Sequence, residues 1–180
     1  MNKKILILTL ALFATSLIVL PTVSACRNID ETEYSAVPFT GSIEIWLEDP
    51  GKISVCHNFL LIKDAYWTGT STTETGTLPY ERWYTIILNM KSGKGWWFAR
   101  AITSIEVAPG IVIGTFEGGG CGKITDYVLS SGHFKLTGTG VAEGMIIIGE
   151  MQNEIIEGDW ITVGSHALTV TSGVTYIPVA

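Results

Sequence analysis

The sequence predicts an all-β protein whose strands close into an antiparallel β-barrel, with a β-sandwich as the alternative. Three observations lead to this fold class. Apolar and polar residues alternate over short runs, which is the period of a strand with one buried face. Glycine-containing turn sequences separate these runs, most regularly between 109 and 151. After the N-terminal region, no stretch of helical length carries an apolar stripe with the helical period.

Two features favour the barrel over the sandwich. Glycines fall inside the expected strands, at Gly114, Gly138 and Gly149, where they relieve the tight corners of a closed sheet. Closure also removes free strand edges. That matters for a chain rich in isoleucine, valine and threonine, because exposed edges of such strands promote aggregation.

Residues 1–25 are expected to form a secretory signal peptide. Asn2–Lys4 is basic, Ile5–Leu20 is apolar, and Val23–Ala25 supplies small residues for cleavage after Ala25. An uncleaved membrane anchor is the weaker alternative, because the apolar run is barely long enough to cross a bilayer. We therefore expect an exported protein, located outside the cell, on its surface or in a periplasm.

Cys26 is a candidate for lipidation. Val23–Cys26 fits a bacterial lipobox, in which the cysteine is acylated, but the same residues fit ordinary signal peptidase cleavage. Contact with a membrane is expected only through the signal segment or a lipid on Cys26. If Cys26 is acylated, Cys56 and Cys121 remain as an even pair in an oxidising compartment, and we expect a disulfide between them.

Cleavage after residue 25 of 180 leaves 155 residues, which suits one domain over 39–180 behind a polar lead-in at 26–38. Without Lys3 and Lys4, the 11 basic residues fall to 9 against 17 acidic ones, a net charge of −8. No cluster of lysine or arginine remains to neutralise phosphates, so nucleic acid is not an expected partner. The sequence carries no signal for an oligomeric state.

The first expected strand illustrates the pattern. Ile43, Ile45 and Leu47 share one face, and Glu44 and Trp46 share the other. We expect strands at 42–47, 53–63, 68–77 (an edge strand with a loop), 83–90, 96–107, 111–117, 123–129, 133–139 and 144–151, then two or three within 155–179. We expect turns at 49–51, 92–95, 108–110, 118–122, 130–132 and 140–143.

The glycine-rich meander is similar to that of a known superfamily. Gly114–Gly118, Gly132–Gly140 and Gly144-Met145 resemble the glycine-punctuated strands of allene oxide cyclase/dirigent-like β-barrel proteins, and resemble small secreted, uncharacterised barrels more closely still. The resemblance covers about forty of the 180 residues. It implies a barrel whose apolar lumen holds a small lipid or phenolic ligand. No residue here matches the catalytic residues of the plant members, which weakens the case for an isomerase.

Tryptophans are the most informative side chains after the signal segment. Trp96 and Trp97 are adjacent in an expected strand, so they point to opposite faces, and Trp96 shares its face with Phe98 and Arg100. Trp46 shares a face with two glutamates, so we expect it outside the apolar core. These rings form either a ligand-binding platform or lumen wall, or a core with a partly covered rim. The candidate ligand-binding residues are Trp46, Trp67, Trp96, Trp97 and His133.

Catalytic and metal-binding signals are weak. His57, His133 and His166 lie far apart, without zinc-ligand spacing, and no metal or cofactor is expected. His133 shares its face with Lys135, so a solvated histidine is the simpler alternative to a general base. Gly118–Gly122 lacks the Gly-Lys-Ser/Thr ending of a phosphate loop. The sequence identifies no catalytic residue.

Three functions remain, in order of preference. The first is a non-enzymatic exported barrel that binds a small apolar ligand or another component of the envelope. The second is a cyclase- or isomerase-type enzyme acting inside the lumen. The third is a carbohydrate-binding module that uses Trp46 and its neighbours. An enzyme requires convergent titratable groups, which the sequence does not show, so binding comes first.

Overall fold

The computed structural model describes residues 33–157 and 165–179, and this part of the chain is all-β. The signal segment, Cys26 and most of the polar lead-in lie outside it. No helix among the described residues is long and apolar enough to cross a membrane. The strands are β1 (Tyr34–Asp49), β2 (Lys52–Cys56), β3 (Phe59–Thr73), β4 (Gly76–Asn89), β5 (Lys94–Ala108), β6 (Ile111–Thr125), β7 (Val128–Gly140), β8 (Ile146–Glu157) and β9 (Ser165–Pro178).

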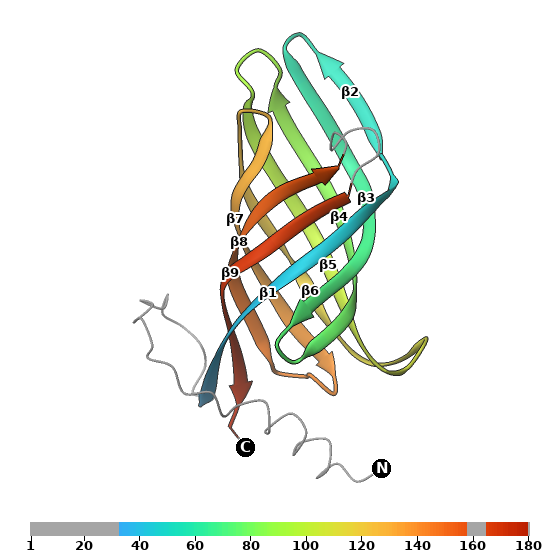
Figure 1. Ribbon diagram of the computed structural model, residues 1–180, viewed down its shortest axis with the longest axis vertical. Coiled ribbons are helices and arrows are strands. Elements are labelled where there is room, and N and C mark those ends of the chain that lie inside the picture. Colours follow the sequence, from blue (N-terminus) through green and yellow to red (C-terminus); the bar gives the residue numbers. More distant parts are fainter. Residues whose placement is uncertain (1–32, 158–164, 180) are drawn as a thin grey trace.

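Eight of these strands close into an antiparallel barrel, which confirms the expected fold class. The sheet order is β1-β9-β8-β7-β6-β5-β4-β3-β2, and β1 also pairs with β3. This last pairing joins the two sides of the sheet, as Figure 1 shows where β1 crosses the front between β9 and β3. β2 is the extra strand, because it pairs only with β3.

Side chains alternate between a packed interior and the outer surface. On β1, Ile43 and Ile45 are at most 5% exposed, whereas Trp46 is 47% exposed. Trp97 on β5 is fully buried, whereas its neighbour Trp96 is 51% exposed. The sequence-based assignments of these faces are therefore confirmed. On β4 every second residue from Tyr80 to Leu88 is buried.

Glycines make room for the largest ring in the interior. Gly122 on β6 and Gly132 on β7 are direct neighbours across the sheet. A side chain on either one would overlap the indole of Trp97; at Gly122 the added carbon would lie 2.6 Å from the ring. The expected turn at 118–122 is therefore wrong, because these glycines lie within β6 and serve packing.

Other boundaries also differ from expectation. The turn after β6 is at Asp126-Tyr127, both with positive φ, so the expected strand at 123–129 and turn at 130–132 are wrong. The segment expected as an edge at 68–77 pairs with neighbours on both sides. The strand expected at 53–63 is a hairpin of β2 and β3. β1 begins at Tyr34, within the expected lead-in, because its first residues pair with β9.

Candidate functional site

The barrel interior contains a buried cation, Arg82 of β4. Its exposed fraction is 1%, and its guanidinium carbon lies 4.3 Å from the ring centroid of Tyr84 and 4.9 Å from that of Trp97. Both terminal nitrogens lie 3.5 Å from the sulfur of Met151 on β8. No described carboxylate forms an ion pair with Arg82. Ring faces, a thioether and a hydrogen bond with the side chain of Tyr80 take the place of the usual counterion.

Polar atoms around Arg82 are left without hydrogen-bond partners. They are the Nε of Arg82, the hydroxyl of Tyr84 and the Nε1 of Trp97. Burial raises the pKa of Tyr84 well above its ordinary value, and burial also raises the pKa of Tyr80, with Arg82 opposing the shift in both cases. Both phenols therefore remain neutral at neutral pH, and neither is set up as a base.

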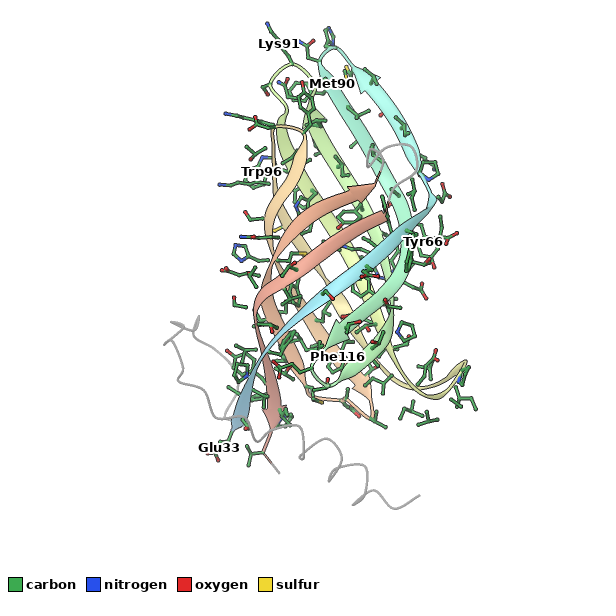
Figure 2. The ribbon with its side chains drawn as sticks, viewed as in Figure 1. Glu33, Tyr66, Met90, Lys91, Trp96 and Phe116 are labelled. Atoms are coloured by element: carbon green, nitrogen blue, oxygen red, sulfur yellow. The ribbon has the colours of Figure 1, made fainter. Side chains whose placement is uncertain are left out.

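The outer wall of β4 and β5 carries a different set of side chains. Lys94, Trp96, Phe98 and Arg100 occupy alternate positions on β5 and are exposed. Trp96 projects away from the barrel in Figure 2. Phe98 is 47% exposed, and the Nζ of Lys123 on β6 lies 5.8 Å from the centroid of the Trp96 ring. Two cations thus bracket two aromatic rings along one strand.

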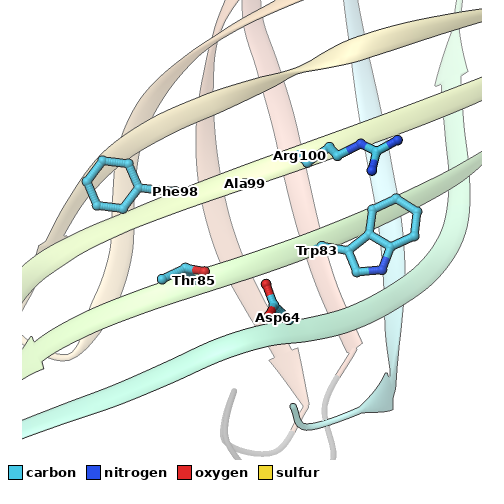
Figure 3. A pocket seen from close by; sticks show the side chains of 6 residues that line it. All are labelled: Asp64, Trp83, Thr85, Phe98, Ala99 and Arg100. Carbon is cyan, nitrogen blue, oxygen red and sulfur yellow. The ribbon is translucent and has the colours of Figure 1, made fainter. Parts of the chain in front are cut away.

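A hollow of about 290 Å³ opens on this wall. Figure 3 shows its side chains on three adjacent strands: Asp64 lies on β3, and the other lining residues lie on β4 and β5. Trp83 is held in place from two sides, because Tyr66 stacks on it at 5.0 Å and Arg100 lies 5.4 Å from its centroid. The residues lining the hollow are Asp64, Trp83, Thr85, Phe98, Ala99 and Arg100.

The hollow combines apolar faces with groups of both charges. Phe98 and Trp83 supply ring faces, Thr85 supplies a hydroxyl, and Asp64 and Arg100 supply an acceptor and a donor at opposite sides. Arg100 also pairs with Glu117 on β6 at 3.7 Å, with both side chains well exposed. A second hollow of about 480 Å³, over β1, β3 and β9, is lined mainly by threonines and carries no aromatic ring.

The structure separates the candidate ligand-binding residues predicted from the sequence. Trp46 and Trp96 lie on the outer wall, but on different sides of the barrel, on β1 and β5. Trp67 and Trp97 lie inside, each packed edge-on against Tyr84. The five residues therefore do not form one site, and only Trp96 lies near the hollow.

His133 lies on the outer surface of β7, as its face predicts. Its Nδ1 is 3.6 Å from a carboxylate oxygen of Glu150 on β8, and the side chain is 74% exposed. On the other neighbouring strand, β6, the residue paired with His133 in the sheet register is Cys121. Among the described residues, no three acidic, histidine or cysteine side chains are placed to hold a metal ion.

The expected disulfide between Cys56 and Cys121 is wrong. Both thiols are free and exposed. Cys56 ends β2 and Cys121 lies on β6, so β3, β4 and β5 stand between them. Four steps of about 4.8 Å separate the two strands by roughly 19 Å around the sheet, whereas a disulfide requires Cα atoms within about 7 Å.

Several residues of both regions are not apparent from the sequence. Asp64, Trp83 and Thr85 join the outer hollow only because β3, β4 and β5 are adjacent, which sequence alone does not specify. The alternation in Lys94–Arg100 could have revealed the exposed stripe on β5. The burial of Arg82 was not predictable, because a charged residue in an alternating pattern usually indicates the solvent-exposed face.

Comparison with known proteins identifies no relative: no family model, no curated protein and no solved structure matches this chain.

Proposed function

We propose that this protein is an exported, non-catalytic β-barrel that binds a carbohydrate of the cell envelope on the outer wall of β4 and β5. The observation that carries the proposal is the hollow that brings Trp83 and Phe98 together with Asp64, Thr85 and Arg100. A sugar ring has an apolar face, which stacks on aromatic rings, and a hydroxyl edge, which hydrogen-bonds to charged and polar groups. The hollow offers both kinds of contact.

Because the interior of the barrel is packed with side chains, a binding site on the outer wall is better supported than one in the lumen. Trp97, Arg82 and Tyr84 are at most 2% exposed and occupy the centre of the barrel. A small apolar ligand in the lumen, or a cyclase-type reaction there, would have to displace these side chains. The outer wall needs no such rearrangement, because Phe98 and Trp96 are already about half exposed. Binding outside the barrel is therefore the better-supported function.

Export belongs to the same proposal, because an envelope carbohydrate is reached only outside the cytoplasm. The tripartite N-terminus supports cleavage after Ala25. Intact-mass measurement of the protein recovered from its native host would give a chain starting at Cys26, with added acyl mass if that cysteine is lipidated. A mass that includes Met1–Ala25 would contradict export with cleavage.

Affinity electrophoresis tests carbohydrate binding. The purified protein is run in native gels that contain one soluble polysaccharide each, chosen to include neutral and acidic polymers. We expect retardation by at least one polymer. Phe98→Ala should weaken binding about tenfold or more, which is the loss of roughly 1.4 kcal/mol typical of an aromatic contact residue. Phe98 is exposed, so this substitution should leave the fold intact.

Trp46→Ala is the matched control, because Trp46 is an equally exposed aromatic residue on β1, outside the hollow. It should bind as the wild type does. If Trp46→Ala abolishes binding while Phe98→Ala does not, the site is the platform on β1 rather than the hollow. If no polymer retards the protein, the proposed function is wrong.

A further inference from the structure

The outer wall beside the hollow carries several cationic side chains, although the chain as a whole is acidic, with a formal net charge of −6. Four cationic side chains lie on it: Lys94 and Arg100 of β5, Lys123 of β6 and Lys135 of β7. All four are exposed. Carboxylates such as Glu117 and Glu150 lie on the same wall. A ligand that carries negative charge would therefore be attracted where two cations flank a position without a carboxylate between them.

Gly119 opens a gap between two of these cations. Arg100, Gly119 and Lys135 are direct neighbours in one row across β5, β6 and β7. Gly119 has no side chain, and nothing but the backbone of Ala99 lies within 4 Å of the place where one would begin. The two cationic residues therefore flank an open gap, with backbones about 10 Å apart across two strand spacings.

Nearby carboxylates do not neutralise this gap. Glu117 pairs with Arg100 at 3.7 Å, but both side chains are about half exposed or more, so the pair is weak and a ligand can compete with it. Glu150 pairs with His133 in the next row along β7. Lys135 and Lys94 form no ion pair with any described residue. The gap over Gly119 therefore keeps at least one uncompensated positive charge.

The hollow and the gap are continuous through Arg100, which lines both. On one side of Arg100 are the rings of Trp83 and Phe98, and on the other is Gly119. A sugar ring can stack on Phe98 with one substituent pointing across the sheet, past Arg100 toward Lys135. That substituent then lies over Gly119. An anionic substituent there would lie between two cationic residues, both of which can donate charge-assisted hydrogen bonds.

We propose that the ligand is an acidic glycan whose carboxylate binds over Gly119, between Arg100 and Lys135. This inference rests on the proposed function and names its ligand class. The ring faces and Asp64 recognise the sugar itself, and the two cations select its charged form. Lys94 and Lys123 lie toward the other end of the aromatic stripe, where they meet a second charged residue of the same polymer chain.

A matched pair of polymers tests the selection. Polygalacturonate and its highly methyl-esterified form share one backbone and differ in the charge of the carboxyl group. The wild type should bind polygalacturonate at least tenfold more tightly, and its affinity should fall as salt is raised from low to physiological concentration. Lys135→Gln and Arg100→Gln should each weaken binding of the acid about threefold, and the double variant about tenfold, in line with exposed charge pairs. Lys135→Gln should leave binding of the ester unchanged, because Lys135 does not line the hollow that holds the sugar ring.

Lys52→Gln controls for the loss of one positive charge, because Lys52 is exposed on β2, five strand spacings across the sheet from Lys135 on β7. Lys135→Gln is the more direct test, since Arg100 also contacts Trp83. If the wild type binds both polymers equally, or if Lys52→Gln acts like Lys135→Gln, the acidic selection is wrong while the carbohydrate site stands. If neither polymer nor any other polysaccharide binds, the proposed function fails and this inference fails with it.

Discussion

The guanidinium carbon of Arg82 lies 4.3 Å from the centre of the Tyr84 ring, deep inside the barrel. Both residues point inward from the same face of β4, and the ring of Trp97 on the next strand lies 4.9 Å from the same guanidinium carbon. A buried charge normally carries a large desolvation cost unless a carboxylate pairs with it. Here ring faces, a thioether and a hydrogen bond with the side chain of Tyr80 offset part of that cost.

Replacing this cation with a flexible apolar residue should not destabilise the protein. For Arg82→Met we expect the free energy of unfolding to stay within about 1 kcal/mol of the wild type or to rise, because methionine fills similar space without a desolvated charge. Arg82→Ala should lower it by about 3 kcal/mol through the cavity it leaves. Urea denaturation measures both. A loss above about 2 kcal/mol in Arg82→Met would show that the ring contacts outweigh the burial cost.

Alkaline pH should destabilise the barrel through its buried tyrosines. The folded-state pKa values of Tyr80 and Tyr84 are raised by burial, so the unfolded chain releases these protons first. Their stabilising contribution is complete below the ordinary tyrosine pKa of about 10 and is lost as pH rises above it, by up to about 1.4 kcal/mol per pH unit for each residue.

Tyr84→Phe isolates one of these contributions. The variant should show a smaller decrease in unfolding free energy between pH 10 and pH 12 than the wild type, because it lacks one titrating group. Urea denaturation across this range measures the slopes, and phenolate absorbance follows ionisation. Equal slopes in the two proteins would mean that Tyr84 ionises as freely in the folded barrel as in the unfolded chain.

The packing of Trp97 over Gly132 should appear as energetic coupling between the two positions. Gly132→Ala places a methyl group against the indole and should cost about 2–3 kcal/mol, because the interior cannot expand. Trp97→Phe alone leaves a cavity and is also destabilising. The double variant should be more stable than the sum of the two losses implies, by at least about 1 kcal/mol. Additive losses in urea denaturation would exclude direct contact.

Strand faces were predictable from the sequence, whereas several turns were not. Alternation in 42–47 places Trp46 outside, and alternation in 96–107 places Trp96 and Trp97 on opposite faces; the burial of these residues confirms both predictions. The error at 118–122 has a physical cause. A run of glycines usually indicates a turn, but these residues lie in mid-strand, where Gly122 accommodates a ring from the neighbouring strand. Such packing depends on register, which local composition does not encode.

The candidate site was predictable only in part, for a similar reason. The stripe of Trp96, Phe98 and Arg100 follows from alternation within one strand. Trp83 and Asp64 join it because β4 pairs with β5 and β3 pairs with β4. Lys135 of β7 joins it because β6 pairs with both β5 and β7. The five candidate residues were selected from the sequence by chemical type, without information on their relative positions. The barrel distributes them between the interior and different parts of the outer wall.

Cys56 and Cys121 should both react as free thiols in the folded protein. Each is exposed, and three strands separate β2 from β6, so a separation of roughly 19 Å around the sheet prevents a bond without breaking the sheet. Alkylation with iodoacetamide under native, non-reducing conditions, followed by peptide mapping of the monomeric protein, should find the label on both residues. The melting temperature should not change when a reductant is added, because no intramolecular bridge between these residues contributes to stability. A cross-linked peptide containing both cysteines would contradict the barrel register itself, since a disulfide within one chain would require β2 and β6 to lie side by side.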